Sequence, residues 1–146
     1  MTEKFLDYLE SIGLTETLAQ RVMSIHDFYA RLCPEKIAGT FVTEYFTEEG
    51  EREYGSLWFF SESYGMEALD FIRKDHFDIM HMGQRVQYVE VTKENYDFVE
   101  ATKESRLRVQ FTLKGGQFYG DLKASGNNCD YLAEILKEHV MRNLAK

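Results

Sequence analysis

One segment of the sequence gathers residue types that bind metal ions or transfer protons. It reads Asp75-His76-Phe77-Asp78-Ile79-Met80-His81. On an extended strand, His76 and Asp78 share one face, because successive side chains point to opposite sides. The two could bind one metal ion together, or the carboxylate could orient the imidazole for acid–base chemistry. No third ligand is evident, and polar residues around a turn give the same pattern, so we predict neither a metal site nor a catalytic site.

A second candidate is the acidic stretch between two aromatic-rich segments. It contains Glu48, Glu49, Glu51, Arg52 and Glu53. Carboxylates could bind a cation there, but the stretch lacks the alternating oxygen ligands of a calcium loop. We interpret it as a solvated turn and keep its residues as candidates for a binding surface.

Other patterns that carry chemistry are missing. Cys33 and Cys129 belong to no CxxC or metal-spaced set, so we expect free buried thiols, although the sequence leaves a disulfide between them open. No GxxxxGK[ST] or GxGxxG motif is present, and Ser56, Ser61 and Ser63 lack a GxSxG setting. We therefore expect no cofactor and favour a binding protein over an enzyme.

Composition narrows the partners. The chain has 146 residues and a formal net charge of −8. Residues 1–60 carry 5 Lys and Arg against 11 Asp and Glu, a net charge of −6. An acidic chain without a basic stripe argues against nucleic acid and anionic lipid as partners. No apolar run approaches the roughly 20 residues of a membrane helix, and the N-terminus lacks the order of a signal peptide, so we expect one cytoplasmic domain.

The most regular part of the chain is residues 106–146. Gly115-Gly116 suits a type I′ turn, which needs positive φ at both central positions. This turn pairs Leu107–Leu113 with Phe118–Ala124 and sets Phe111 opposite Gly120. A helix beyond it has an apolar stripe at helical spacing, formed by Leu132, Ile135, Leu136, His139, Val140 and Leu144. A two-stranded ribbon cannot bury its own apolar face, so the helix should pack against a larger sheet.

Two helices are predicted at the start of the chain. Residues 2–12 form the first, which Gly13 ends. Thr15 or Thr17 opens the second, and Pro34 closes it. The second helix carries a narrow apolar seam, formed by Leu18, Val22, Ile25, Tyr29 and Leu32. We expect this seam to dock on the sheet, with homodimer formation as the alternative.

Strands are predicted between these ends. Residues 41–46 and 55–60 form a hairpin rich in aromatic residues. Residues 64–75 fit either a helix or a strand. Strand pattern returns at 79–82, at 86–91 with a bulge near Tyr88, and at 96–101. The fold class is therefore α+β.

About seven antiparallel strands followed by a closing helix resemble the pleckstrin-homology-like (PH-like) fold, which includes the GRAM domains. The resemblance covers roughly residues 40–143 and rests on Gly55–Phe60 and on Leu107–Leu122 with the helix after it. At 36–146 it implies a barrel or strongly bent sheet closed by the C-terminal amphipathic helix. The helical segment at 1–35 lies outside the family pattern, and we expect it to be an extension.

The resemblance also bears on the ligand. Phosphoinositide binders of this family carry lysines and arginines on the first two strands and the loop between them. Here that loop, Thr47–Glu53, has four glutamates and one arginine. It would repel a phosphate, so the resemblance implies a protein or peptide partner. That partner would bind at a sheet edge or in the groove beside the C-terminal helix.

The alternative is an α+β pocket protein of NTF2-like type, which binds or converts a small molecule. Asp75, His76, Asp78 or His81 would then act as acid or base. This alternative needs a cavity of at least ~300 Å³.

Overall fold

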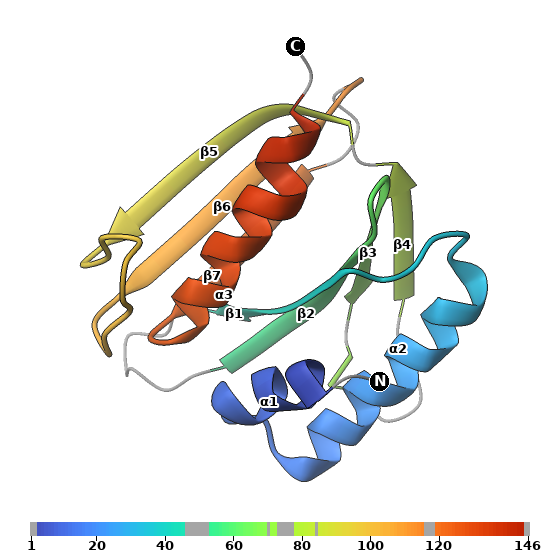
Figure 1. Cartoon of the computed structure of the whole chain (residues 1–146), viewed down its shortest axis with the longest axis horizontal. Helices are drawn as coiled ribbons and strands as arrows, with labels where there is room; N and C mark the ends of the chain where they lie inside the picture. The colour runs from blue at the N-terminus through green and yellow to red at the C-terminus, as the bar shows by residue number, and fades with distance from the viewer. Residues whose placement is uncertain are drawn as a thin grey trace.

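Two antiparallel sheets and three α-helices make up the part of the protein that the structure describes (Figure 1). The computed structural model describes residues 3–45, 53–69, 71–72, 78–83, 85–115 and 119–144. The first sheet has the strand order β1-β2-β3-β4 and the second has the order β5-β6-β7. The elements are α1 (Glu3–Ser11), α2 (Glu16–Leu32), β1 (Gly39–Tyr45), β2 (Glu53–Phe60), β3 (Tyr64–Leu69), β4 (Asp78–Gly83), β5 (Val86–Glu94), β6 (Arg106–Leu113), β7 (Tyr119–Ser125) and α3 (Asn128–Ile135).

The hairpin β6–β7 has the predicted register. Residues 107–111 pair with residues 120–124, and Phe111 lies opposite Gly120. A Cβ atom on Gly120 would come within 2.4 Å of the Phe111 ring, so only glycine leaves room for that ring. Gly115 has the positive φ of 102° that the predicted turn needs. The rest of that turn lies outside the described residues.

The two sheets do not close into a barrel, so that part of the expectation was wrong. The strands β1 and β7 are neighbours, but side chains of β1 join them. The Thr43 hydroxyl accepts a hydrogen bond from the Lys123 N–H (2.8 Å), and the Glu44 carboxylate accepts one from the Ser125 N–H (3.0 Å). These side chains take the place of strand carbonyls, so no backbone ladder links the two sheets within the ranges that the structure describes.

The strand predicted at residues 96–101 was also wrong. These residues form turns, and Asn95 and Phe98 have positive φ values of 52° and 63°. The Asp97 carboxylate accepts a hydrogen bond from the Val99 N–H (3.0 Å), which is an Asx turn. The alternation of side chains in this segment therefore reflects a turn and not a pleated strand. By contrast, the choice left open at residues 64–75 is settled for Tyr64–Leu69, which form β3.

The helices α1 and α2 cover one face of the first sheet. Of the two threonines predicted to open α2, Thr15 is the cap, and its hydroxyl accepts a hydrogen bond from the Leu18 N–H (3.3 Å). Val22, Ile25 and Tyr29 are buried beneath the helix, and the Tyr29 ring stacks on Phe59 of β2 (6.0 Å between centroids). The seam therefore docks on the sheet, although Leu32 at its end stays 62% exposed.

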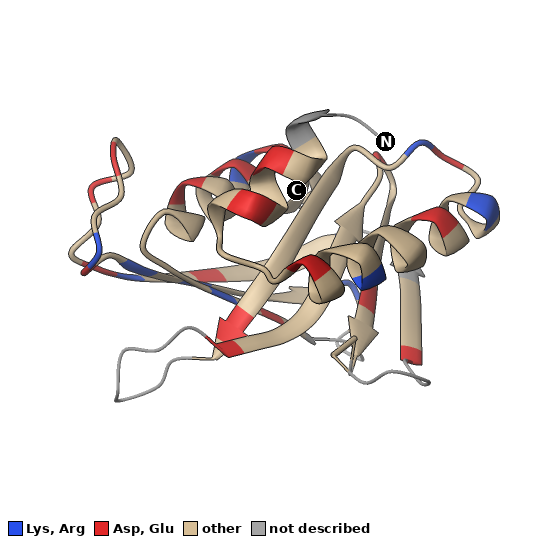
Figure 2. Ribbon diagram, turned by 90° about the horizontal axis from the view of Figure 1, so that it is seen from below, with Lys and Arg blue, Asp and Glu red and all other residues tan. Residues whose placement is uncertain are grey.

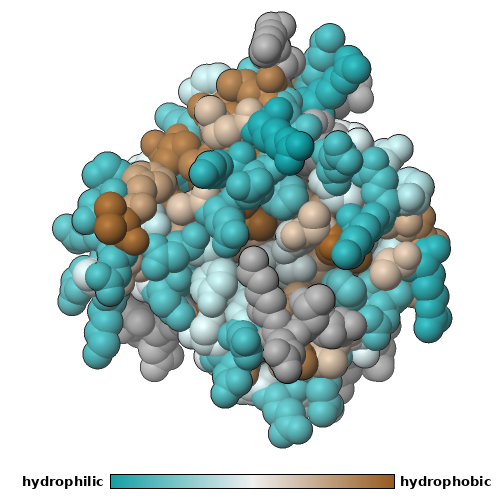
Figure 3. Space-filling view, viewed as in Figure 1, coloured by the Kyte–Doolittle hydropathy of each residue, from teal (hydrophilic) through white to brown (hydrophobic). Residues whose placement is uncertain are grey.

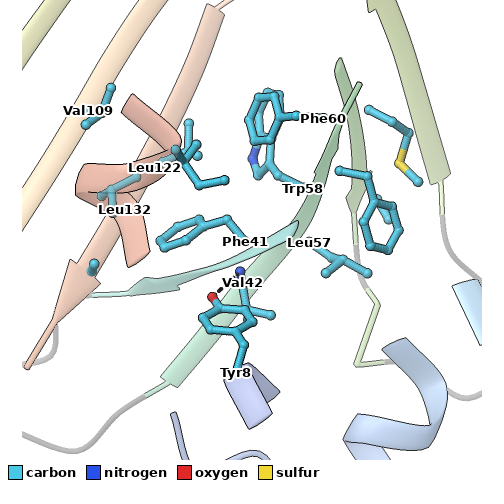
Figure 4. Packing of buried hydrophobic residues seen from close by; sticks show 14 of the residues in the cluster. Tyr8, Phe41, Val42, Leu57, Trp58, Phe60, Val109, Leu122 and Leu132 are labelled. Atoms are coloured by element: carbon cyan, nitrogen blue, oxygen red, sulfur yellow. Dashed lines mark hydrogen bonds between the residues drawn. The ribbon is translucent and has the colours of Figure 1, made fainter. Parts of the chain in front are cut away.

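The other face of the first sheet looks towards α3 and the second sheet (Figure 4). Phe41, Trp58 and Phe60 are fully buried there, and Trp58 contacts the edge of Phe111 from β6 (5.8 Å). Most of the predicted stripe of the C-terminal helix is buried against this layer, and only Leu144 is 37% exposed. Residues from both sheets and all three helices thus share one hydrophobic core. None of the helices in the described ranges has the length and apolarity that crossing a membrane requires.

Candidate functional site

A hollow of about 530 Å³ lies between α3 and the pair α1–α2, the helices that Figure 1 places on either side of residues 35–40. We call it the helix groove. It is lined by Phe5 and Tyr8 of α1, by His26 and Ala30 of α2, by residues 35–40, and by Tyr131, Glu134, Ile135, Glu138 and His139 of the C-terminal helix.

Aromatic side chains form the walls of the groove near α1. The rings of Tyr8 and Tyr131 pack at 4.4 Å, and those of Phe5 and His26 at 5.1 Å. The Ser11 hydroxyl donates a hydrogen bond to the Tyr131 hydroxyl (3.1 Å). The walls are thus apolar surfaces with a few polar atoms at fixed places, as in most ligand sites.

A buried hydrogen-bond network fixes this wall. The Tyr8 hydroxyl donates to Asn128 Oδ1 (3.0 Å) and accepts from the Val42 N–H (2.8 Å), a bond drawn in Figure 4. The Asn128 amide group donates to Glu44 Oε2 (2.7 Å). The network ties α1, β1 and the start of α3 together. The sequence gives no signal for this network, because Tyr8, Glu44 and Asn128 lie far apart along the chain.

His139 forms the opposite end of the groove. It is 9% exposed and stacks on Phe60 of β2 (5.1 Å, 15° between planes). Gly39 makes room for it, because a Cβ atom there would lie 2.5 Å from His139 Nε2. Burial lowers the pKa of His139, although the negative charge of Glu138 opposes that shift. His139 is therefore mostly neutral at pH 7.

The helix that carries His139 changes its winding at this point. Residues Leu136–Val140 form a π-helical turn between α3 and a short 3₁₀ turn, Met141–Asn143. The wider turn buries two successive residues, His139 and Val140. Such turns are rare and often lie at functional sites. The sequence predicted one regular helix, because no single-residue signal marks a π turn.

Carboxylates dominate the charged residues of the groove. Glu35, Glu134 and Glu138 line it, against one lysine, Lys36. The Glu35 carboxylate accepts hydrogen bonds from the Ser63 N–H (2.9 Å) and the Ser61 hydroxyl (2.8 Å). These bonds, that of the Ser63 backbone first, lower the pKa of Glu35 and keep it ionised.

The residues predicted from the acidic stretch and from the Asp–His segment do not form the groove. Glu53 is the first residue of β2 and Asp78 the first of β4; both are exposed and neither lines the groove. The other candidates, Glu48, Glu49, Glu51, Arg52 and His76, lie outside the described residues.

His81 lies at the contact between α2 and the first sheet. Its Nδ1 atom lies 2.5 Å from the Tyr29 hydroxyl of α2, and its ring stacks on Tyr64 (4.9 Å). Within the described part of the chain, no three side chains that bind metals come together. Cys33 is half-buried and Cys129 buried, and both are free thiols.

Some aromatic side chains are exposed away from the groove. Phe28, Tyr45, Tyr88 and Phe98 are 44–58% exposed. On the face shown in Figure 3, hydrophilic residues predominate and apolar ones form small separate areas. The apolar residues on this face are therefore scattered, whereas those that line the groove form one concave surface.

Comparison with known proteins adds no assignment to this geometry. No protein-family model, no curated protein and no solved structure matches the chain.

Proposed function

We propose that the protein is a non-enzymatic binding module that takes a segment of a protein partner in the helix groove. The observation that carries this proposal is the 530 Å³ hollow with aromatic walls beside the C-terminal helix. Its volume falls within the range of about 300–1,000 Å³ that is usual for ligand sites. The groove lies where the sequence led us to expect a partner.

An extended peptide suits the groove because one wall is a strand. Ala38 and the first two residues of β1, Gly39 and Thr40, line the groove, and β1 is an edge strand of its sheet. The later part of β1, from Val42 on, is already hydrogen-bonded to Tyr8, Asn128 and β7, so only its start faces the groove as an edge. Edge strands offer backbone donors and acceptors to a bound peptide, while pockets beside them hold its side chains.

The PH-like relationship belongs to the same proposal. Four antiparallel strands, three more and a terminal helix packed on them support it. The helices α1 and α2 lie outside the family pattern, and they supply one wall of the groove. The site that we propose would thus be an addition to the family's architecture.

A small-molecule site of NTF2-like type is the second candidate. The volume of the groove exceeds the ~300 Å³ that this alternative requires. Helices, a linker and the start of β1 form the walls, however, and the Asp–His segment contributes no side chain from its described residues to them. Binding of a small molecule without chemical conversion is the form of this alternative that fits the walls.

Filling the groove tests the proposal. Ala30 is exposed and lines the groove, so Ala30→Trp should block it; Gln20→Trp adds the same side chain at an exposed position of α2 outside it. Peptides selected from a random library on the parent protein should lose at least about tenfold in affinity on Ala30→Trp and keep it on Gln20→Trp. Selected peptides that bind both variants alike would show that the groove is not the site.

A further inference from the structure

We propose that the helix groove selects a basic peptide segment, in which one aliphatic or aromatic anchor side chain is flanked by lysine or arginine. This inference rests on the proposed function and names the chemistry of its partner.

The place for the anchor is the apolar part of the groove. Phe5, Ile37, Tyr131 and Ile135 line it, and each is buried or half-buried. An apolar side chain that enters would replace water on these surfaces, which favours binding by about 25 cal/mol per Å² removed from water. Anchors of this kind usually dominate the energetics of an interface.

The place for the basic flanks is set by the carboxylates on two sides of the groove. Glu134 and Glu138 stand one turn apart on the C-terminal helix, and Glu35 lies on the linker across from it. Glu35 is held by Ser61 and Ser63, so its position is fixed before a partner arrives. Lys36 is the one lysine among the residues that line the groove. With three carboxylates against this lysine, the groove favours a cationic partner and speeds its association.

Charge also excludes other occupants. A second copy of this chain carries the same net charge of −8, and acidic side chains outnumber basic ones on the helices, as Figure 2 shows. A phosphate or an anionic lipid headgroup would meet the same carboxylates. His139 brings no compensating positive charge at pH 7, since its burial lowers its pKa.

The test uses fluorescein-labelled peptides with one phenylalanine anchor, flanked by lysines, serines or glutamates, with binding measured by fluorescence polarisation. The lysine-flanked peptide should bind about tenfold or more tighter than the serine-flanked one, and the glutamate-flanked peptide weakest. The difference in affinity between the lysine-flanked and the serine-flanked peptide should decrease as the salt concentration rises.

A matched pair of variants separates local from overall charge. Glu134→Gln with Glu138→Gln removes two carboxylates of the groove, whereas Glu90→Gln with Glu104→Gln removes two exposed carboxylates outside it. Both doubles have the same net charge. Only the groove double should lose most of the preference for lysine, and circular dichroism should show that both remain folded.

Three results would overturn the inference. The first is equal binding of the lysine and serine peptides, and the second is an equal effect of the two double variants. In either case, if Ala30→Trp still abolished peptide binding, the proposed function would remain supported and only the preference for basic peptides would be wrong. The third is the absence of binding by every peptide, including those selected on the parent, and it would remove both proposals together.

Discussion

Two regions where helices pack beside the first sheet contain similar residues but differ in how completely the side chains fill the space between the elements. Beneath α2, Val22, Ile25 and Tyr29 fill the space against the first sheet, and the Tyr29 hydroxyl meets His81. Beside the C-terminal helix, similar aromatic and histidine side chains leave a hollow of about 530 Å³. The first region is a closed interface and the second an open one. Packing that is complete stabilises the fold, whereas packing that stops short leaves apolar surface for a partner.

The two histidines differ in exposure as well as in surroundings. His81 is exposed, yet its ring stacks on Tyr64 and its Nδ1 atom contacts the hydroxyl of the buried Tyr29. His139 stacks on Phe60 but also lines the groove, where a partner would meet it. Residue type alone therefore does not separate a structural histidine from one at a surface for binding.

The largest expected effect comes from a charge in the closed interface. Val22 is fully buried, so Val22→Asp should lower the free energy of unfolding by about 3–5 kcal/mol, because the carboxylate would be buried without a partner. Urea denaturation measures this. Ser24→Asp, at an exposed position of the same helix, should change stability by less than about 0.5 kcal/mol.

This variant also addresses the alternative role of the seam. If Val22→Asp unfolded no more easily than Ser24→Asp but dissociated a dimer in sedimentation experiments, the seam would join two copies and the docked arrangement of α2 would be wrong.

A smaller loss is expected where the C-terminal helix meets β1. Gly39→Ala would set a methyl group 2.5 Å from His139 Nε2, so the buried His139 ring or the helix that carries it must shift. Overpacking of this kind costs about 1–3 kcal/mol. In Gly83→Ala the new methyl group meets nothing within 4 Å, so this control should be close to neutral in the same denaturation experiment. Equal stability of the two variants would contradict the close contact with His139.

The hydroxyl group of Tyr29 should matter less. Tyr29→Phe removes the contact with His81 Nδ1 and keeps the ring, so we expect a loss of about 1 kcal/mol in the free energy of unfolding. Tyr88→Phe removes a hydroxyl at a 56%-exposed position and serves as the control. A similar change in both would mean that the Tyr29–His81 contact adds nothing to the closed interface.

Because His139 lies in the open region with a lowered pKa, the stability of the protein should depend on pH. The pKa of His139 is lower in the folded protein than its ordinary value of 6.5. The unfolded chain therefore binds the proton more tightly, and stability that is present above pH 6.5 is lost as the pH falls towards the folded pKa. Between about pH 7.5 and pH 5.5, the parent should lose more stability than His139→Gln. Parallel curves would show that His139 is not shielded from water.

The smallest effect concerns anionic lipid, for which we expect no binding at all. The protein should not co-sediment with vesicles that contain phosphatidylinositol bisphosphate at any salt concentration. Its net charge of −8 and the carboxylates of the groove repel the anionic headgroups. Salt-sensitive binding to these vesicles would contradict the expected repulsion between the acidic protein and anionic partners, and it would favour a lipid-binding function.

Local patterns in the sequence predicted much of the fold. The spacing around Gly115 set the register of Phe111 and Gly120, and Thr15 capped its helix, since both depend on residues close in the chain. Segment 96–101 misled us, because an Asx turn at Asp97 and an alternating strand can share one pattern. The barrel was wrong because the joint between β1 and β7 depends on Thr43 and Glu44 meeting a strand some eighty residues away.

The candidate site could not be predicted to the same extent. The sequence pointed to the neighbourhood of the C-terminal helix, but of the residues that line the groove it singled out only Ile135 and His139, two members of the apolar stripe. The groove arises where α1, α2 and the C-terminal helix approach each other, and each contributes only two to five side chains. The Asp–His segment and the acidic stretch drew attention because they are contiguous in sequence, which a surface assembled from four segments is not.

The side-chain joint between β1 and β7 links the packing of the two sheets to the wall of the groove. Each sheet keeps its own backbone ladder, while Thr43 and Glu44 hold the two together at Lys123 and Ser125. Removing the Thr43 hydroxyl or the Glu44 carboxylate would take away an acceptor for an N–H group of β7 and leave both ladders in place. Because the Glu44 network also reaches Tyr8 through Asn128, loss of the Glu44 carboxylate would also affect the wall of the groove next to the first helix.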